Sequence, residues 1–272
     1  ESKNDPYALW VFILYNKNYS KKGVGPYLKR VAESSTSIDD FYHKLIFSIL
    51  DLDCNSDTFD KEYLERKKLI SNIDYGIRDY CTRVKSLYPP LDRISYLTDT
   101  NLLEKECILD SIVEYADINK ESLKKLCKSY PDLYHYFDDM DYLNGDDIGY
   151  FNEYRQFKVL NKKPDDGLLK HIKENAENRP YLSYGSCSKN IEKVTKQDTK
   201  VIFIDAMGVE FIPYILSICS DLNLDAEVMV CCARLPTITE VNKKVIENCN
   251  AVKVYKDLDE IIHNKSNEPN NY

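Results

Sequence analysis

The chain has 272 residues, of which 43% are hydrophobic and 30% are charged. This composition is typical of a globular protein with a buried core, and it argues against global disorder. The formal net charge is −8, so non-specific attraction of the whole chain to nucleic acid is not expected. The longest apolar run, 8–14, is far shorter than the roughly 20 residues that a membrane-spanning helix needs.

The cysteines and the first residues both predict a cytoplasmic protein with no membrane partner. Nine cysteines are scattered along the chain without a Cys-x-x-Cys pair, which is typical of reduced thiols. The N-terminal residues lack the basic and then apolar pattern of a secretory signal. We therefore expect a cytoplasmic location, and we do not expect structural zinc on the cysteines.

Apolar residues recur at helical spacing through the first two thirds of the chain. The pattern predicts helices at 7–15, 37–52, 60–87, 101–113, 121–129, 150–160 and 167–176. Sustained alternation of apolar and polar residues is lacking before about residue 196. We therefore expect a helical N-terminal domain at 1–196.

Polar and helix-breaking residues mark the ends of these predicted helices. Ser37 and Asn101 each precede a helix in the position of an N-cap. Gly76 weakens the long pattern at 60–87, and the prolines at 89–90 end it.

The pattern changes after the polar stretch 196–200. Short apolar runs rich in β-branched residues predict three strands, and helical spacing lies between them. The expected strands are 201–205, 226–232 and 251–255, and the expected helices are 209–222 and 237–248. Because strands and helices alternate, we expect an α/β segment with a parallel sheet at 197–272.

Two polar residues follow the expected strands, at the sheet edge where ligands usually bind. Asp205 ends the first strand, and Thr237 opens the helix after the second. A carboxylate there can hold a divalent cation, and a metal can stabilise the alkoxide of a threonine nucleophile. Both residues are also explained as helix caps, and the spacing alone favours that simpler explanation.

Three blocks of sequence follow one another in the last third of the chain. They are Val201-Ile-Phe-Ile-Asp-Ala-Met-Gly-Val-Glu-Phe211, Leu235-Pro-Thr-Ile-Thr-Glu-Val-Asn-Lys243 and Lys256-Asp-Leu-Asp-Glu-Ile-Ile-His263. In this order they resemble the PglZ domains of bacterial BREX phage-defence systems. PglZ domains are similar to the alkaline phosphatase superfamily. The resemblance covers about residues 197–272. It implies that the mainly α N-terminal domain is followed by an α/β segment that opens an alkaline-phosphatase-like domain.

The resemblance also implies roles for individual residues. Asp205 would be a metal ligand, and Thr237 would be both the catalytic nucleophile and a metal ligand. Thr239, Asn242 and Lys243 would support them. The implied cofactor is a divalent metal, zinc or a similar ion. The continuation Gly-Val-Glu in the first block resembles a type 4 BREX system.

An alkaline-phosphatase-like site needs further Asp and His ligands to hold one or two metals. The four histidines are His43, His135, His171 and His263, and only the last lies in a resembling block. We therefore expect the N-terminal part of a metal-dependent phosphatase or phosphodiesterase, with an incomplete site and no activity of its own.

Two other functions stay open. The helical domain can be a scaffold that docks other components of the defence system, with no catalysis by this chain. A phosphate-binding domain of the receiver kind is supported by Asp205 alone. The expected partners are other BREX-system proteins, with nucleic acid or a phosphate ester as the substrate of the full-length protein.

Two further motifs carry less weight. The acidic stretch 138–141 is like a calcium loop, but Gly145 is the seventh residue from Asp139, where an EF-hand needs its glycine sixth. The tyrosine-rich stretch 130–150 could stack on bases, but acidic residues surround it. Its composition therefore favours packing or a protein interface.

Overall fold

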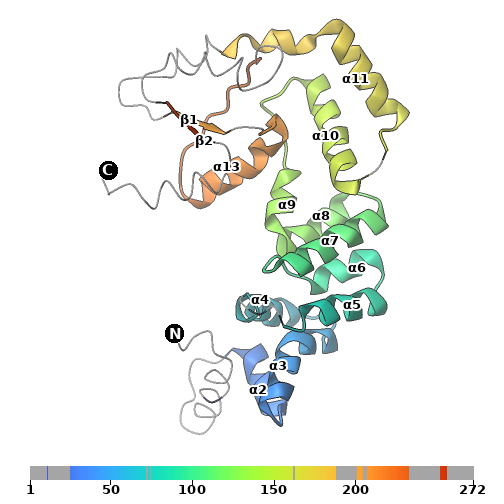
Figure 1. The fold of residues 1–272 in the computed structure, drawn as a ribbon, viewed down its shortest axis with the longest axis vertical. Helices are drawn as coiled ribbons and strands as arrows, with labels where there is room; N and C mark the ends of the chain where they lie inside the picture. Colours follow the sequence, from blue (N-terminus) through green and yellow to red (C-terminus); the bar gives the residue numbers. More distant parts are fainter. Residues whose placement is uncertain are drawn as a thin grey trace. The chain divides into compact units, whose positions relative to one another are not determined.

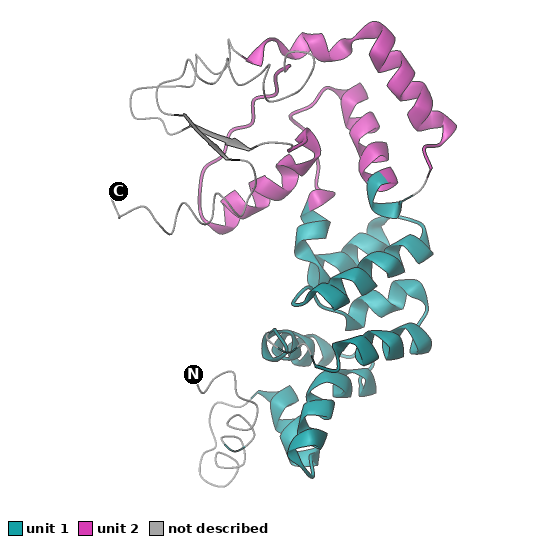
Figure 2. Cartoon of the chain, viewed as in Figure 1, with its two compact units in different colours: residues 1–135, 158–162 teal, residues 136–157, 163–272 magenta. Residues whose placement is uncertain are grey.

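A computed structural model gives the fold of the chain (Figure 1). The structure describes residues 11, 25–71, 73, 75–161, 163–187, 201–204, 207–232 and 252–255, with the backbone alone at 201–204 and 252–255. The chain divides into two compact units (Figure 2). Unit 1 comprises 1–135 and 158–162, and unit 2 comprises 136–157 and 163–272. The expected boundary at 196/197 lies outside the described residues and stays a prediction.

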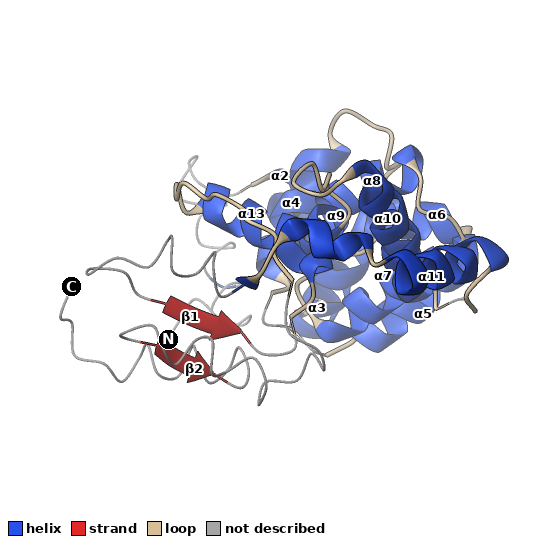
Figure 3. Ribbon diagram, turned by 90° about the horizontal axis from the view of Figure 1, so that it is seen from above, coloured by secondary structure: helices blue, strands red, loops and turns tan. Residues whose placement is uncertain are grey.

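Helices dominate the described residues (Figures 1 and 3). Unit 1 contains α2 Pro26–Ser34, α3 Ile38–Phe47, η2 Ser48–Asp51, α4 Phe59–Leu69, α5 Ile77–Leu87, α6 Pro90–Arg93, η3 Ile94–Tyr96, α7 Leu102–Tyr115 and α8 Lys120–Ser129. The two units share α9 Pro131–Tyr136 and α10 Gly145–Leu160. Unit 2 adds α11 Asp166–Asn178, η4 Pro180–Tyr184, η5 Val209–Phe211 and α13 Ile212–Asp221. The prediction of a mainly helical chain is confirmed for these residues, whereas the predicted helix at 7–15 lies outside them apart from Val11.

The sequence-predicted caps start their helices as expected. The Ser37 side-chain oxygen accepts a hydrogen bond from the Asp40 backbone N–H at 3.1 Å, at the start of α3. The Asn101 side-chain oxygen accepts from the Glu104 backbone N–H at 2.9 Å, at the start of α7. Each bond satisfies a backbone donor that the helix itself leaves unpaired.

The start of α2 is capped from another helix. Its N-cap residue, Gly25, has no side chain, and Glu65 of α4 takes over the role. The Glu65 carboxylate accepts from the backbone N–H groups of Tyr27 at 3.0 Å and Leu28 at 3.3 Å. A Cβ atom on Gly25 would collide with the Glu65 carboxylate, so a larger residue here would displace this cap.

The single long helix predicted at 60–87 is wrong. The structure forms two helices instead, α4 and α5, with a turn between them. Gly76 is the N-cap of α5 and has a φ of 78°, in the left-handed region that glycine adopts without steric cost. The backbone at Gly76 therefore breaks the predicted helix in two, rather than only destabilising it.

Within unit 1, helices pack mainly on helices close to them in the sequence. Helix α2 packs on α3 and α4, α3 packs on α5, and α7 packs on α5 and α6. The 3₁₀ turn η3 packs against α8. Figure 1 shows these elements following one another along the unit in chain order.

A buried ion pair joins α4 to α7. Arg66 Nη2 and Glu104 Oε1 lie 3.3 Å apart, and both side chains are fully buried. Arg66 Nε also donates to the Ile46 carbonyl of α3 at 3.0 Å, and Glu104 accepts from the Thr98 backbone N–H. The guanidinium carbon lies 4.2 Å from the centre of the Tyr80 ring. These partners replace the water that both charges lose on burial.

Buried tyrosines form further hydrogen bonds inside this core. The Tyr27 hydroxyl donates to the Leu45 carbonyl at 2.8 Å, and the Tyr80 hydroxyl donates to the Tyr96 carbonyl at 2.6 Å. Burial raises the pKa of Tyr27 to about 12, although nearby arginines lower it. These phenols therefore stay neutral over the physiological pH range.

Two short strands, β1 Val201–Ile204 and β2 Val252–Tyr255, pair in parallel (Figure 3). In their register Val201 lies opposite Val252, and Ile204 lies opposite Tyr255. The predicted helix at 209–222 forms as η5 and α13, whereas the one at 237–248 lies outside the described residues.

The strand predicted at 226–232 is wrong. Its described residues join no ladder, and Cys232 alone makes an isolated bridge, with Ser186. The side chains at 224–227 are exposed, so this apolar run lacks the cover that a buried strand needs. The three-stranded α/β unit is therefore not shown.

Removing one charge of the buried Arg66–Glu104 pair is expected to cause a large loss of stability. Glu104→Gln keeps the shape of the side chain but leaves the Arg66 charge unpaired, and we expect a loss of about 3–5 kcal/mol in the free energy of unfolding. Urea unfolding followed by circular dichroism measures it. The control is Asp110→Asn in the exposed Lys85–Asp110 pair, where about 0–1 kcal/mol is expected. Equal losses in the two variants would contradict a structural role for the buried pair.

The pKa of Tyr27 predicts a specific sensitivity to alkali. The folded pKa is raised to about 12 from an ordinary 10.0, so the stability that the neutral phenol confers is present below pH 10 and is lost as the pH rises toward 12. We expect the free energy of unfolding to fall more steeply in this interval for the parent chain than for Tyr27→Phe. The difference is at most about 1.4 kcal/mol per pH unit. The exposed Tyr75→Phe is the control, and a Tyr27→Phe slope equal to that of the parent would refute the assignment.

Candidate functional site

All the catalytic and metal-binding residues predicted from the sequence lie outside the described residues. They are Asp205, Thr237, Thr239, Asn242 and Lys243. The described backbone reaches Ile204, directly before Asp205, at the end of β1. The expected approach of Asp205 and Thr237 at a sheet edge therefore stays a prediction.

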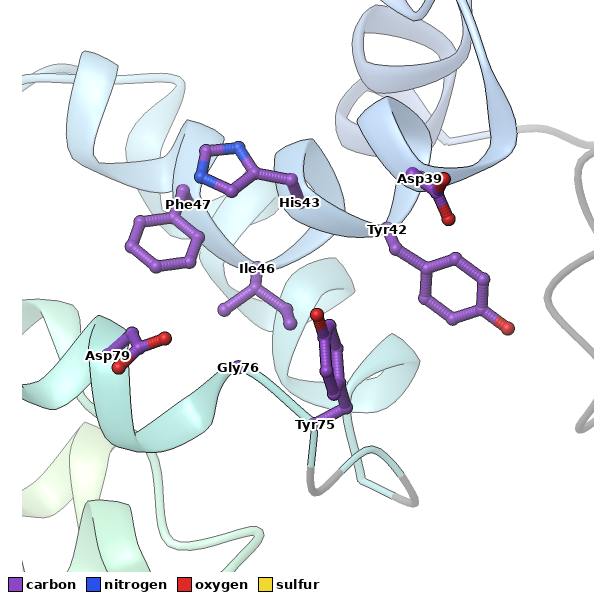
Figure 4. A pocket seen from close by; sticks show the side chains of 8 residues that line it. All are labelled: Asp39, Tyr42, His43, Ile46, Phe47, Tyr75, Gly76 and Asp79. Carbon is purple, nitrogen blue, oxygen red and sulfur yellow. The ribbon is translucent and has the colours of Figure 1, made fainter.

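The described residues contain a pocket of about 550 Å³ in unit 1, between α3 and the start of α5 (Figure 4). We call it the α3–α5 pocket. It is lined by Asp39, Tyr42, His43, Ile46, Phe47, Tyr75, Gly76 and Asp79. Figure 4 shows Ile46 between the other side chains of α3 and the turn that precedes α5.

The pocket has two walls that come from different parts of the sequence. The α3 wall consists of five residues spaced at i, i+3, i+4, i+7 and i+8 from Asp39, which places them on one face of the helix. The other wall comes from Tyr75, Gly76 and Asp79, in the turn before α5 and its first turn. The packing of α3 on α5 brings the two walls together.

Aromatic rings form much of the α3 wall. The rings of His43 and Phe47 are stacked, with centroids 4.4 Å apart and an interplanar angle of 5°. Phe47 also meets the buried Tyr80 ring edge-on at 5.6 Å, which anchors the stack to the core. On the opposite wall Tyr75 is 82% exposed. The pocket therefore offers flat apolar surfaces that face solvent.

Two carboxylates carry the charge of the pocket. Asp39 and Asp79 are exposed, and neither makes a hydrogen bond or an ion pair with a described residue. No lysine or arginine is among the lining residues. Each carboxylate lies in the first turn of its helix, where negative charge is favourable. Two carboxylates thus lie on opposite walls, with no ionic partner in the part of the chain that the structure describes.

Gly76 sets the approach of the two walls. Its left-handed φ of 78° turns the chain into α5. A Cβ atom at this position would lie 3.1 Å from Ile46 Cδ1, which is closer than ordinary van der Waals contact. The turn therefore lies directly against α3, and the width of the pocket depends on it.

A second pocket, of about 460 Å³, lies beside α8 and includes Lys124, Lys125 and Lys128. Its cations are largely paired. Lys128 forms an ion pair with Asp60, and Lys125 lies 3.1 Å from an oxygen of Asp92. Because these lysines already have anionic partners, they are less available to a ligand. The carboxylates of the α3–α5 pocket have no such partners among the described residues.

In unit 2, a buried arginine organises the acidic stretch 138–141. Arg155 Nη1 donates to the carbonyl oxygens of Tyr136 at 2.6 Å and Asp138 at 2.9 Å. Among the described residues, no group of three or more His, Cys, Asp and Glu side chains is arranged to hold a metal ion. The stretch is thus fixed through its backbone carbonyls.

Two features of the described part concern its thiols and its longest helices. The described cysteines are free thiols. None of the described helices combines the length and the apolar character that crossing a membrane requires.

The sequence reasoning missed every residue of the α3–α5 pocket as a functional candidate. A signal was present, because the spacing from Asp39 to Phe47 places one carboxylate and three aromatic rings on one helix face. The second wall, around Gly76, gave no signal, since its approach to α3 is a long-range contact.

Comparisons with known proteins add one match. A family model described as a domain of unknown function, DUF7863, matches residues 1–115. No curated protein and no solved structure matches the chain. The matched segment contains the whole α3–α5 pocket and the Arg66–Glu104 pair.

Gly76 provides a test of the pocket's geometry. Gly76→Ala forces a Cβ atom into a left-handed backbone against Ile46, and we expect a loss of about 1–2 kcal/mol in the free energy of unfolding. Gly76→Asn should cost less, because asparagine tolerates this conformation better. Urea unfolding of the two variants gives the comparison. A neutral Gly76→Ala would show that the backbone at this turn is free to change.

Proposed function

We propose that the chain is the N-terminal part of a PglZ-like, metal-dependent phosphatase or phosphodiesterase of phage defence, whose helical region docks other components of the system. The observation that carries the hydrolase half is the order and spacing of the three blocks at 201–211, 235–243 and 256–263. The parallel pairing of β1 with β2 supports it, because an α/β segment that opens such a domain needs parallel neighbours. A cytoplasmic location and a type 4 BREX system belong to the same proposal.

The proposed chemistry assigns a role to each matching residue. The Thr237 hydroxyl oxygen attacks the phosphorus of a phosphate ester in line with the leaving ester oxygen, and water then hydrolyses the phosphothreonine. Asp205 would hold a divalent metal, zinc or a similar ion, which when bound lowers the pKa of a coordinated hydroxyl. Thr239, Asn242 and Lys243 would support this arrangement.

The docking half rests on the described helices. The helices of unit 1 pack mainly on helices close to them in the sequence, as do the helices of repeat proteins that bind other proteins. The α3–α5 pocket adds two carboxylates with no ionic partner among the described residues and exposed aromatic surface. These features favour a second candidate function, a helical scaffold that docks other BREX-system proteins without catalysis by this chain.

The hydrolase half predicts metal-dependent turnover in the natural protein that contains this chain. We expect hydrolysis of bis(p-nitrophenyl) phosphate with added zinc or manganese. Asp205→Ala or Thr237→Ala should each lower kcat by at least about 10³-fold, because each removes a different part of the mechanism. Release of nitrophenolate measures the rate. The 272-residue chain alone should turn over poorly, since Asp205 and Thr237 supply fewer ligands than a catalytic metal site uses.

The matched control is Ser220→Ala, an exposed hydroxyl in α13 that has no proposed role. It should leave turnover unchanged. Unchanged turnover in Thr237→Ala would refute the nucleophile. A complete lack of metal-dependent turnover in the natural protein would refute the hydrolase half and favour the scaffold without catalysis.

A further inference from the structure

We infer that the α3–α5 pocket binds a guanidinium group, the side chain of an arginine that projects from a partner protein. The inference deepens the docking half of the proposed function, on which it rests, and does not depend on the hydrolase half. It follows from the charge, the shape and the surface chemistry of the pocket.

The charge of the pocket favours a cationic ligand over an anionic one. Asp39 and Asp79 lie on opposite walls, and neither has an ionic partner among the described residues. Their carboxylates repel any anionic ligand, and none of the described residues that line the pocket is a lysine or an arginine. A guanidinium has five N–H donors in a planar fork, so it can donate two parallel hydrogen bonds to a single carboxylate while its flat face stays free to stack on a ring.

The aromatic surfaces favour a planar cation. The His43 and Phe47 rings are stacked within 5° of parallel, and Tyr75 presents an 82% exposed ring on the other wall. Guanidinium stacks on aromatic faces. It is more weakly hydrated than an ammonium, so it loses less hydration free energy when it leaves water. Carboxylates beside flat rings therefore match arginine better than lysine.

The volume and position of the pocket favour a side chain that arrives from another protein. At about 550 Å³, it can hold a long side chain together with its neighbouring backbone. Its acidic residues are exposed, which leaves the entrance open to solvent. A metal ion is a poorer occupant, because the described residues contain no group of three or more metal-ligating side chains with suitable geometry.

Nuclear magnetic resonance can test this binding directly on the ¹⁵N-labelled chain. The probe is a short alanine peptide that carries one arginine, and the matched probe carries citrulline, which has a similar shape and no charge. We expect the arginine peptide to shift the backbone amide signals of 39–47 and 75–79. The citrulline peptide should bind at least about tenfold more weakly, because charge-assisted hydrogen bonds are lost. A lysine peptide should fall between them.

A pair of charge-matched variants separates the pocket from the acidity of the whole protein. Asp39→Asn with Asp79→Asn should weaken binding of the arginine peptide at least about tenfold. The control is Glu121→Gln with Asp132→Asn, which removes the same charge from the first turns of α8 and α9. The control should bind like the parent, and unchanged spectra away from the pocket report that both variants are folded.

Three outcomes would overturn the inference. They are equal binding of the arginine and citrulline peptides, tighter binding of the lysine peptide, and equal weakening by the two double variants. Failure of the phosphodiester assay would leave this result intact, so the two halves of the proposed function fail separately.

Discussion

The arrangement of unit 1 depends on one buried charge, that of Arg66. Taking a guanidinium and a carboxylate out of water costs several kcal/mol per ion, and only well-placed partners offset that cost. Glu104 supplies the opposite charge, the Ile46 carbonyl accepts a hydrogen bond, and the Tyr80 ring covers the guanidinium. Arg66 Nη1 has no hydrogen-bond partner among the described residues. The Tyr80 ring and the ion pair with Glu104 therefore offset more of the cost of burying the guanidinium. The positions of α3, α4, α5 and α7 are thereby linked.

That link extends to the candidate site. Ile46 accepts from Arg66 through its backbone, while its side chain lines the α3–α5 pocket and meets the Gly76 turn. The floor of the pocket is thus held by the core, whereas Asp39 and Tyr75 at its edge are exposed. A pocket whose base is held by the core and whose entrance is exposed suits the binding of a side chain. Few of its own residues have to become ordered on binding, so the entropic cost is low.

Local signals in the sequence predicted local structure well. Ser37 and Asn101 cap their helices through bonds to residues three positions away, so their neighbours suffice to predict them. Gly76 was recognised as a weak point, but neither its left-handed backbone nor its approach to Ile46 is encoded in a local pattern. The apolar run at 226–232 was predicted to be a strand, because composition does not show whether other elements pack over the segment. The pocket needs α3 beside α5, and Asp205 and Thr237 lie outside the described residues.

The Arg66–Glu104 pair also has a consequence for the order of events during synthesis. The two residues are 38 positions apart, so α2 to α5 leave the ribosome before the carboxylate that neutralises Arg66 exists. Until residue 104 has emerged, closing this core would bury an unpaired charge, and the early helices must stay loosely associated. The core around Arg66 can therefore be completed only after α7 has been synthesised.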